Sequence, residues 1–303
     1  MAVKVGDVVG RKSYRHDVFF RVKDIQRSEG GPVAILKGLD VRLLADAPVD
    51  DLEVKRPDEI MRYRHASIVK TAECLRRIRA RRTEEQEACA CASSSSVHSG
   101  SAEEDDGESH YHVTGRVLHL DGDEEYLQKC LQTYSQLEVV AYGVPVPEGE
   151  QARRLPELLR QYRPDILVLT GHDALLRKGS ADRNRLDSYR SSRHFIEAVQ
   201  AARSLCPSLD ELVIFAGACQ SFYEAIIEAG ANFASSPGRV LIHAYDPVFL
   251  VEKLAYTSIY AKLSARDVIT NTITGSEGIG GVDTRGRMRH AYPGRKPPYS
   301  QAV

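Results

Sequence analysis

The stretch DILVLTGHDA, residues 165–174, decides the fold class, because a continuous apolar run ends abruptly in a glycine followed by a histidine and an aspartate. A second stretch, ELVIFAGACQS (residues 211–221), repeats this pattern after an intervening amphipathic segment. Strands that are apolar throughout are typical of parallel sheets, which are buried on both faces. The two stretches therefore predict neighbouring strands of a parallel sheet that is flanked by helices.

Strand and helix patterns alternate along the rest of residues 111–303, which indicates one α/β domain. Further strands are expected at GRVLHLDGD (115–123), LEVVAYGVPV (137–146) and GRVLIHAYDP (238–247). Helices are expected at residues 124–134, 152–162, 192–205, 222–230 and 248–258. The glycine-rich run GSEGIGG (275–281) does not follow a first strand, so we expect a loop bordering the cleft and not a dinucleotide fingerprint.

Two different regions precede this domain. Residues 1–56 contain several short strand patterns separated by glycines, which predict a small β-barrel of the SH3 or KOW type. Residues 57–110 are expected to form a charged helix, to about residue 88, followed by a disordered linker, CACASSSSVHSGSAEEDDGES (89–109). The arginines of this helix, between Arg76 and Arg82, are expected on a solvated face.

Composition narrows the class of protein further. The chain is 42% hydrophobic and 27% charged with a formal net charge of -1, so we expect no nucleic-acid partner. It contains no apolar run of about 18 residues and no apolar signal-peptide core, so we expect no membrane association and a cytoplasmic location. The cysteines are then expected to be thiols; they are Cys74, Cys89, Cys91, Cys130, Cys206 and Cys219.

The two strand ends quoted above carry the candidate chemistry. His172 and Cys219 each follow an apolar strand, and the carboxyl ends of parallel strands meet at one edge of a sheet. A thiol beside an imidazole there can perform nucleophilic acyl transfer, with Cys219 attacking and His172 serving as general acid and then base. Gly171 and Gly217 would allow the tight turns, and backbone N–H groups near His172 and Cys219 would form the oxyanion site. A helix expected to start near Ser221 would lower the pKa of the Cys219 thiol.

Other interpretations of the same residues stay open. A cysteine at the end of a buried strand is often inert packing, and the spacing of His172 and Cys219 alone favours neither interpretation. An amidotransferase-like hydrolase would use a histidine after the cysteine, such as His243. A flavodoxin-like binding module with an RNA-binding barrel would use neither. No pattern for a cofactor or a metal site is found, because the expected Cys and His spacings are absent.

Two resemblances go beyond these patterns. The His and Cys blocks after apolar strands are similar to those of the caspase–haemoglobinase group of cysteine peptidases, although this chain has His172-Asp173 where that group has His-Gly. Nearly the whole chain also resembles the YabG family of sporulation-specific peptidases of spore-forming Firmicutes. The blocks that carry this second resemblance are VGDVVGRKSY (5–14), VLHLDGDEEYL (117–127), YRPDILVLTGHDA (162–174), LVIFAGACQS (212–221), AGANFASSP (229–237) and GIGGVDTRG (278–286).

The resemblance implies a cysteine endopeptidase that uses Cys219 and His172, needs no cofactor and cleaves spore coat and related proteins after arginine. It implies action in the mother cell or at the spore coat. The arginine run at residues 76–82, beside the expected linker, suggests self-cleavage there.

Specificity for arginine would require a carboxylate near the strand ends. Asp121, Asp173 and Asp246 each follow an expected strand, and each could equally cap a helix or shape a turn. The sequence favours Asp246 slightly, with Asp121 as the second candidate and Asp173 as a residue that orients His172 or its turn.

Overall fold

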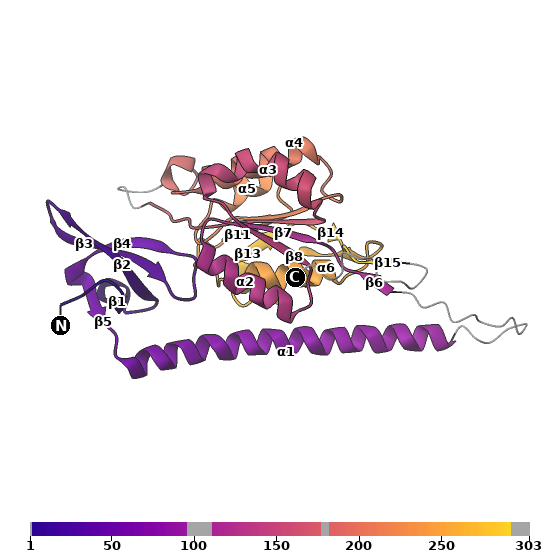
Figure 1. The fold of residues 1–303 in the computed structure, drawn as a ribbon, viewed down its shortest axis with the longest axis horizontal. Coiled ribbons are helices and arrows are strands. Elements are labelled where there is room, and N and C mark those ends of the chain that lie inside the picture. The colour runs from indigo at the N-terminus through magenta and orange to yellow at the C-terminus, as the bar shows by residue number, and fades with distance from the viewer. Residues whose placement is uncertain (1, 96–110, 177–181, 292–303) are drawn as a thin grey trace, which may run out of the picture.

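A computed structural model describes residues 2–95, 111–176 and 182–291 of the 303-residue chain. Within these residues, Figure 1 shows an antiparallel sheet near the N-terminus, one long helix and a larger helix-covered sheet. The N-terminal sheet has the strand order β4-β3-β2-β1-β5. Its strands are β1 (Val8–Arg11), β2 (Phe19–Ser28), β3 (Gly31–Gly38), β4 (Leu44–Pro48) and β5 (Leu52–Val54), with short 3₁₀ turns η1 (Lys12–Tyr14) and η2 (Val49–Asp51).

The larger sheet is mixed, with the strand order β13-β11-β10-β9-β7-β8. Its strands are β7 (Val117–Asp121), β8 (Ala141–Pro145), β9 (Ile166–Thr170), β10 (Val213–Ala216), β11 (Phe233–Ser235) and β13 (Ile279–Gly281). The pairs from β8 to β11 are parallel, as the apolar runs predicted, but β13 pairs with β11 antiparallel. The α/β class is therefore confirmed, and the purely parallel sheet is wrong at this edge.

Helices cover both faces of this sheet (Figure 1). The helices α3 (Glu148–Tyr162), α4 (Ser192–Leu205) and α5 (Tyr223–Glu228) pack on one face, and α2 (Glu124–Gln136), α6 (Asp246–Ala255) and α7 (Ala265–Ile269) pack on the other. Successive strand residues point to opposite faces, so Val117 joins the core beneath α2 and α6 while Leu118 joins the core beneath α3 and α4. Short connections complete the domain: β6 (Tyr111–Val113), β12 (Lys262–Leu263), β14 (Thr284–Arg285), β15 (Arg289–Ala291), η3 (Leu186–Ser188) and η4 (Gly275–Glu277).

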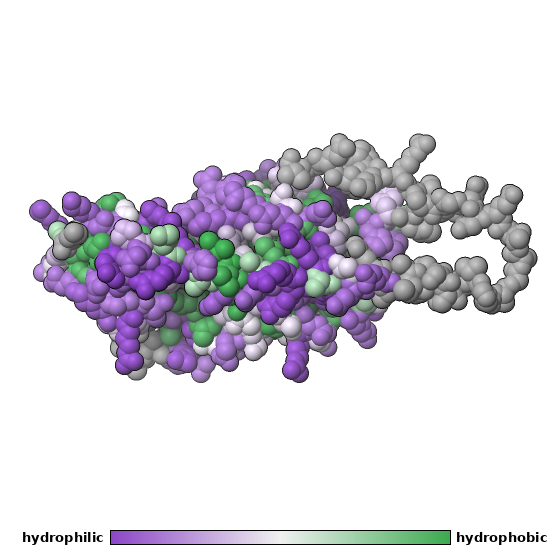
Figure 2. Space-filling model, turned by 90° about the horizontal axis from the view of Figure 1, so that it is seen from below, coloured by the Kyte–Doolittle hydropathy of each residue, from purple (hydrophilic) through white to green (hydrophobic). Residues whose placement is uncertain are grey.

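The long helix α1 (Pro57–Ser95) runs beneath the layer formed by α2 and α6 (Figure 1). It packs through Cys74 and Ile78, which are buried, whereas Met61 and Ile68 nearer its start are exposed. Figure 2 views the molecule from this side, where hydrophilic side chains cover much of the surface with hydrophobic ones scattered among them. None of the described helices combines the length and apolarity that crossing a bilayer requires.

Two expectations about this part of the chain need correction. The helix continues to Ser95, so the expected linker does not begin at residue 89; residues 96–110 lie outside the described residues. The arginine run is not uniformly solvated, because Arg81 and Arg82 both pair with the buried carboxylate of Glu252, at 2.5 and 2.7 Å. Such a pair is stable only if the buried charge keeps its partners, so these arginines hold α1 against α6.

Two segments near the C-terminus also differ from expectation. GRVLIHAYDP (238–247) is not a strand of the sheet; its backbone turns away after Ser236 and Arg239, which both have positive φ. Its Leu241 packs instead against the core of the N-terminal sheet, and its His243 forms an isolated bridge with Val41. GSEGIGG (275–281) is not simply a loop, because it forms η4 and the edge strand β13.

Candidate active site

The strands β9 and β10 bring His172 and Cys219 to the same edge of the sheet. The two strands are adjacent and parallel, with Leu169 opposite Ala216, and His172 and Cys219 follow their ends by two and three residues. Among the described residues the Cys219 sulfur makes no hydrogen bond to the His172 ring. The thiol and the imidazole therefore lie at the same edge of the sheet but are not hydrogen-bonded to each other in this structure.

Cys219 is fully buried, and burial raises the pKa of its thiol to about 12. Its Sγ lies 3.8 Å from the carbonyl oxygen of Ile242, and the backbone of Arg42 also lies against it. The helix that follows is shorter than expected, since α5 begins only at Tyr223, after Gln220 with φ of 56°. The thiol is thus protonated here, and the expected activation by a helix starting near Ser221 is absent.

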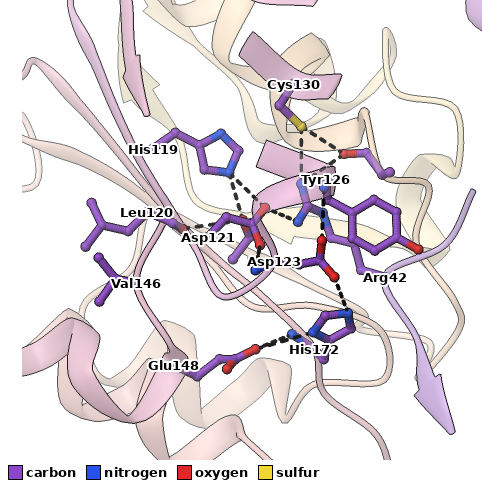
Figure 3. Close-up of polar contacts among 12 residues, drawn as sticks. Arg42, His119, Leu120, Asp121, Asp123, Tyr126, Cys130, Val146, Glu148 and His172 are labelled. Atoms are coloured by element: carbon purple, nitrogen blue, oxygen red, sulfur yellow. Dashed lines mark hydrogen bonds and ion pairs between the residues drawn. The ribbon is translucent and has the colours of Figure 1, made fainter. Parts of the chain in front are cut away.

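The imidazole of His172 lies between two carboxylates that come from different elements (Figure 3). Its Nε2 is 3.3 Å from Asp123 Oδ2, and its Nδ1 is 3.7 Å from Glu148 Oε1. Glu148 also accepts a hydrogen bond from the His172 backbone N–H at 2.6 Å. Burial alone would lower the pKa of His172, but these two carboxylates outweigh it and raise the pKa. A protonated imidazole suits a general acid.

Neither Asp123 nor Glu148 was predicted from the sequence. Asp123 caps α2 by accepting from the Tyr126 N–H at 3.1 Å, and Glu148 is the first residue of α3. Asp123 lies two residues after the end of β7 and Glu148 three residues after the end of β8, and these two strands pair in parallel. Their position at the carboxyl edge was the available signal, because helices that follow parallel strands begin at that edge.

Glycine is required at positions 171 and 217 for different structural reasons. Gly217 has φ of 113°, a conformation that favours glycine, and a Cβ there would collide with Ser235 Oγ. Gly171 has no such φ, but a Cβ at this position would collide with the Glu148 carboxylate. The close approach of Glu148 to His172 therefore depends on Gly171 having no side chain.

Asp173 is buried and holds together the two loops that carry His172 and Cys219. Its Oδ1 accepts from the N–H groups of Ala174 and Ser191 at 2.9 and 2.7 Å. Its Oδ2 accepts from the hydroxyls of Ser192 and Ser221, the latter at 2.9 Å. With four donors satisfied and no contact to the imidazole among the described residues, Asp173 connects the loops and does not orient the His172 ring.

Asp121 is buried and lies against the buried guanidinium group of Arg42 (Figure 3). The Arg42 Nη1 forms an ion pair with Asp121 Oδ2, although 79 residues separate the two in the chain. The Arg42 Nη2 lies 3.2 Å from Cys130 Sγ and 3.3 Å from the carbonyl oxygen of Ala244, and the ring of Tyr126 is 5.3 Å from the guanidinium carbon. Carboxylate, carbonyl and ring together make a site suited to arginine.

Asp246 faces a different part of the molecule. Its carboxylate accepts from the backbone N–H groups of His243 and Ile273 at 3.0 and 2.7 Å, and from the Thr274 N–H and hydroxyl. These donors use its oxygens to fix the 243–246 and 273–274 turns. The ring of His243 lies 3.2 Å from the hydroxyl of Ser67 on α1, and burial lowers its pKa to about 4.

A groove of about 890 Å³ adjoins the candidate site. It lies between the N-terminal sheet and the loops that follow β9 and β10, with Leu43, Leu44, Leu175 and Gln220 among its lining residues. Within the described residues, no three His, Cys, Asp or Glu side chains gather as metal ligands would.

Fold and site together define a class: an α/β protein whose sheet edge carries a thiol, an imidazole flanked by carboxylates, and a buried pair of Arg42 and Asp121. Comparison with known proteins identifies the family. Residues 4–293 match the family model described as YabG peptidase U57. The chain is also 45% identical over 298 residues to the sporulation-specific protease YabG of Bacillus subtilis (strain 168), covering 97% of this chain and 99% of that protein. No solved structure matches the chain. The chain therefore belongs to the YabG family of peptidases.

Proposed function

We propose that this chain is a cysteine endopeptidase of sporulation that cleaves proteins after arginine. The observation that carries the proposal is the adjacent, parallel pairing of β9 and β10, which places His172 and Cys219 at one edge of the sheet. Family membership supports a peptidase, and the name of the Bacillus relative supports a role in sporulation. Spore coat and related proteins are the proposed substrates, cut in the mother-cell cytoplasm or at the coat.

In the proposed mechanism, Cys219 first loses its thiol proton to solvent, and the thiolate then attacks the scissile carbonyl and forms an acyl-enzyme with release of the amine. His172 donates a proton to the leaving amine, and then takes one from the water that hydrolyses the thioester. The Cys219 backbone N–H has no hydrogen-bond partner among the described residues, so it is free to bind the oxyanion. The His172 N–H already donates to Glu148, which leaves the turn around Gly171 as the second part of this site.

We propose Asp121 and not Asp246 as the carboxylate that binds the substrate arginine. A guanidinium group occupies the Asp121 pocket, whereas the oxygens of Asp246 are used by backbone and hydroxyl donors. Self-cleavage within residues 76–82 remains part of the proposal. These residues lie inside α1, so a cut there requires local unwinding of the helix.

The test compares Cys219→Ala and His172→Ala with Cys206→Ala, a matched change of a cysteine outside the site. We expect each of the first two to lower kcat/KM on an arginyl peptide at least about 10³-fold, because nucleophile and acid–base catalysis are lost. We expect Cys206→Ala to retain wild-type kcat/KM. Activity of either site variant near the wild-type level would contradict the assignment.

A further inference from the structure

A short part of the N-terminal sheet region reaches into the candidate active site. Residues 39–43, here called the inserted segment, connect β3 to β4. They contact the α/β domain through backbone bonds: Asp40 accepts from the Ala244 N–H at 2.9 Å, and Val41 forms an antiparallel bridge with His243. Tyr126 donates to the Val41 carbonyl at 2.8 Å. An extended peptide that adds to an exposed backbone edge binds in the same way.

Arg42, in the middle of this segment, occupies the pocket and covers the nucleophile at the same time. Its guanidinium is wholly buried against Asp121, and its backbone lies against the Cys219 sulfur. One guanidinium nitrogen, Nε, is buried without a hydrogen-bond partner among the described residues. A peptide with arginine before its scissile bond would need both of these places, the pocket for its side chain and the sulfur beside its backbone.

Cavities lie on both sides of the inserted segment. One, of about 580 Å³, is lined by Gly38, Leu39 and Asp40, and the groove of about 890 Å³ is lined by Leu43 and Leu44. Val41 and Arg42 therefore stand between two open spaces. On withdrawal of the segment, the Arg42 backbone would no longer lie against the Cys219 sulfur.

We propose that the inserted segment is an intramolecular pseudosubstrate: Arg42 occupies the arginine-specificity pocket at Asp121, and the segment must leave before a substrate can bind. The proposal rests on the proposed function, since it identifies the pocket of that same site. It explains why Cys219 is buried and protonated in this state. A tethered occupant competes at a high effective concentration, so substrates bind in proportion to the fraction of open molecules.

The first experiment compares Arg42→Gln with wild type and with Arg27→Gln, a matched change at an exposed arginine of β2. Iodoacetamide labelling of Cys219 is followed by peptide mass spectrometry, with Cys206 of the same molecules as reference. We expect Arg42→Gln to increase the Cys219 labelling rate about tenfold or more and to lower KM for an arginyl peptide by a similar factor, with a smaller change in kcat. Arg27→Gln should behave as wild type. Unchanged labelling and KM in folded Arg42→Gln protein would overturn the proposal.

The second experiment needs no catalysis, so it separates this proposal from the proposed function. Binding of agmatine, which carries a guanidinium but no scissile bond, is measured by calorimetry on Cys219→Ala protein with and without Arg42→Gln. We expect binding only when Arg42 is replaced, and loss of that binding when Asp121→Asn is added. If agmatine binds as expected but no variant cleaves peptides, the proposed function fails and the pseudosubstrate stands. If peptides are cleaved through Cys219 but replacing Arg42 changes neither agmatine binding nor labelling, the pseudosubstrate fails alone.

A third measurement covers the case in which Arg42→Gln does not fold. Hydrogen exchange of residues 39–43 is measured in Cys219→Ala protein, which retains Arg42, with and without an excess of an arginyl peptide. We expect faster exchange with the peptide, because bound peptide displaces the segment. Exchange that stays the same at saturating peptide would mean that the segment is a fixed structural contact and would overturn the proposal.

Discussion

His172 is the residue whose surroundings say most about the chemistry of the site. Its imidazole is mostly buried, with 13% of the side chain exposed, and yet its pKa is raised because Asp123 and Glu148 flank it. Burial would by itself favour the neutral ring, so the site uses two carboxylates to keep a proton available. In the proposed mechanism that proton goes to the leaving amine, which makes Asp123 and Glu148 positioning residues.

The first prediction concerns Glu148→Gln, which keeps a hydrogen-bond acceptor for the His172 N–H but removes the charge. We expect the pKa of His172 to fall, so the high-pH limb of the kcat/KM profile moves to lower pH. NMR titration of the His172 ring should show the same direction. Glu150→Gln, on the same turn of α3 but with 50% of the side chain exposed, is the matched control. A His172 titration that stays in place would contradict the role given to Glu148.

The contact between His172 and Glu148 also stabilises the folded protein within a defined pH range. His172 has a raised folded pKa, so its contribution is full below its unfolded value of 6.5 and is lost as pH rises through the folded pKa. Glu148 has a lowered folded pKa, so its contribution requires a pH above 4.5. We therefore expect Glu148→Gln to lower the free energy of unfolding most, by about 1 kcal/mol, between pH 4.5 and pH 6.5. Urea unfolding across this range measures it.

At the scale of elements, α1 is held to the α/β domain by a buried carboxylate. Glu252 on α6 is fully buried, and its partners Arg81 and Arg82 lie inside the arginine-rich run. Arg82 also donates to the Leu137 carbonyl at 2.8 Å and stacks on the ring of Tyr256. The proposed self-cleavage sites are therefore protected by helical structure and by these contacts.

Glu252→Ala should expose those sites. Without the carboxylate, two arginines lose their partner at a mostly buried contact. We therefore expect the free energy of local unfolding of the second half of α1 to fall by about 2 kcal/mol, so that this part opens more often. The protein should then shorten itself at residues 76–82 faster than wild type, as measured by mass spectrometry over hours. Glu73→Ala, at an exposed position of the same helix, should not change the rate. Equal shortening in Glu252→Ala,Cys219→Ala protein would mean that another protease makes the cut.

Some elements of the fold could be predicted from the sequence and others could not. The apolar runs of β9 and β10 are buried on both faces, so local pattern and fold agree and the strands were predicted correctly. Residues 238–247 have a similar apolar pattern, but they lie outside the sheet, and His243 among them bridges to Val41 of the inserted segment. Asp121 was a candidate because it ends a strand; nothing local connects it to Arg42, since that contact depends on how the two regions dock.

At the scale of the whole molecule, the N-terminal sheet region touches the candidate active site through β3 and the inserted segment. Lys37, at the end of β3, lies 2.7 Å from Asp123 and 2.8 Å from Glu125, and its side chain is only 8% exposed. Asp123 is also the partner of His172. The docking of one region and the protonation of the His172 imidazole in the other thus share the Asp123 carboxylate.

Lys37→Met should therefore weaken the docking in a pH-dependent way. Both carboxylates have a lowered folded pKa, with Glu125 at about 2, so the contribution of Lys37 is full above 4.5 and is lost as pH falls through the folded values. We expect Lys37→Met to lower the unfolding free energy by about 2 kcal/mol at pH 7 and by clearly less at pH 3. Urea unfolding at the two pH values, with Lys23→Met at an exposed position of β2 as control, measures the difference. The same loss at both pH values would mean that Lys37 acts through packing of its stem, and that its charge does not connect the N-terminal sheet to the site.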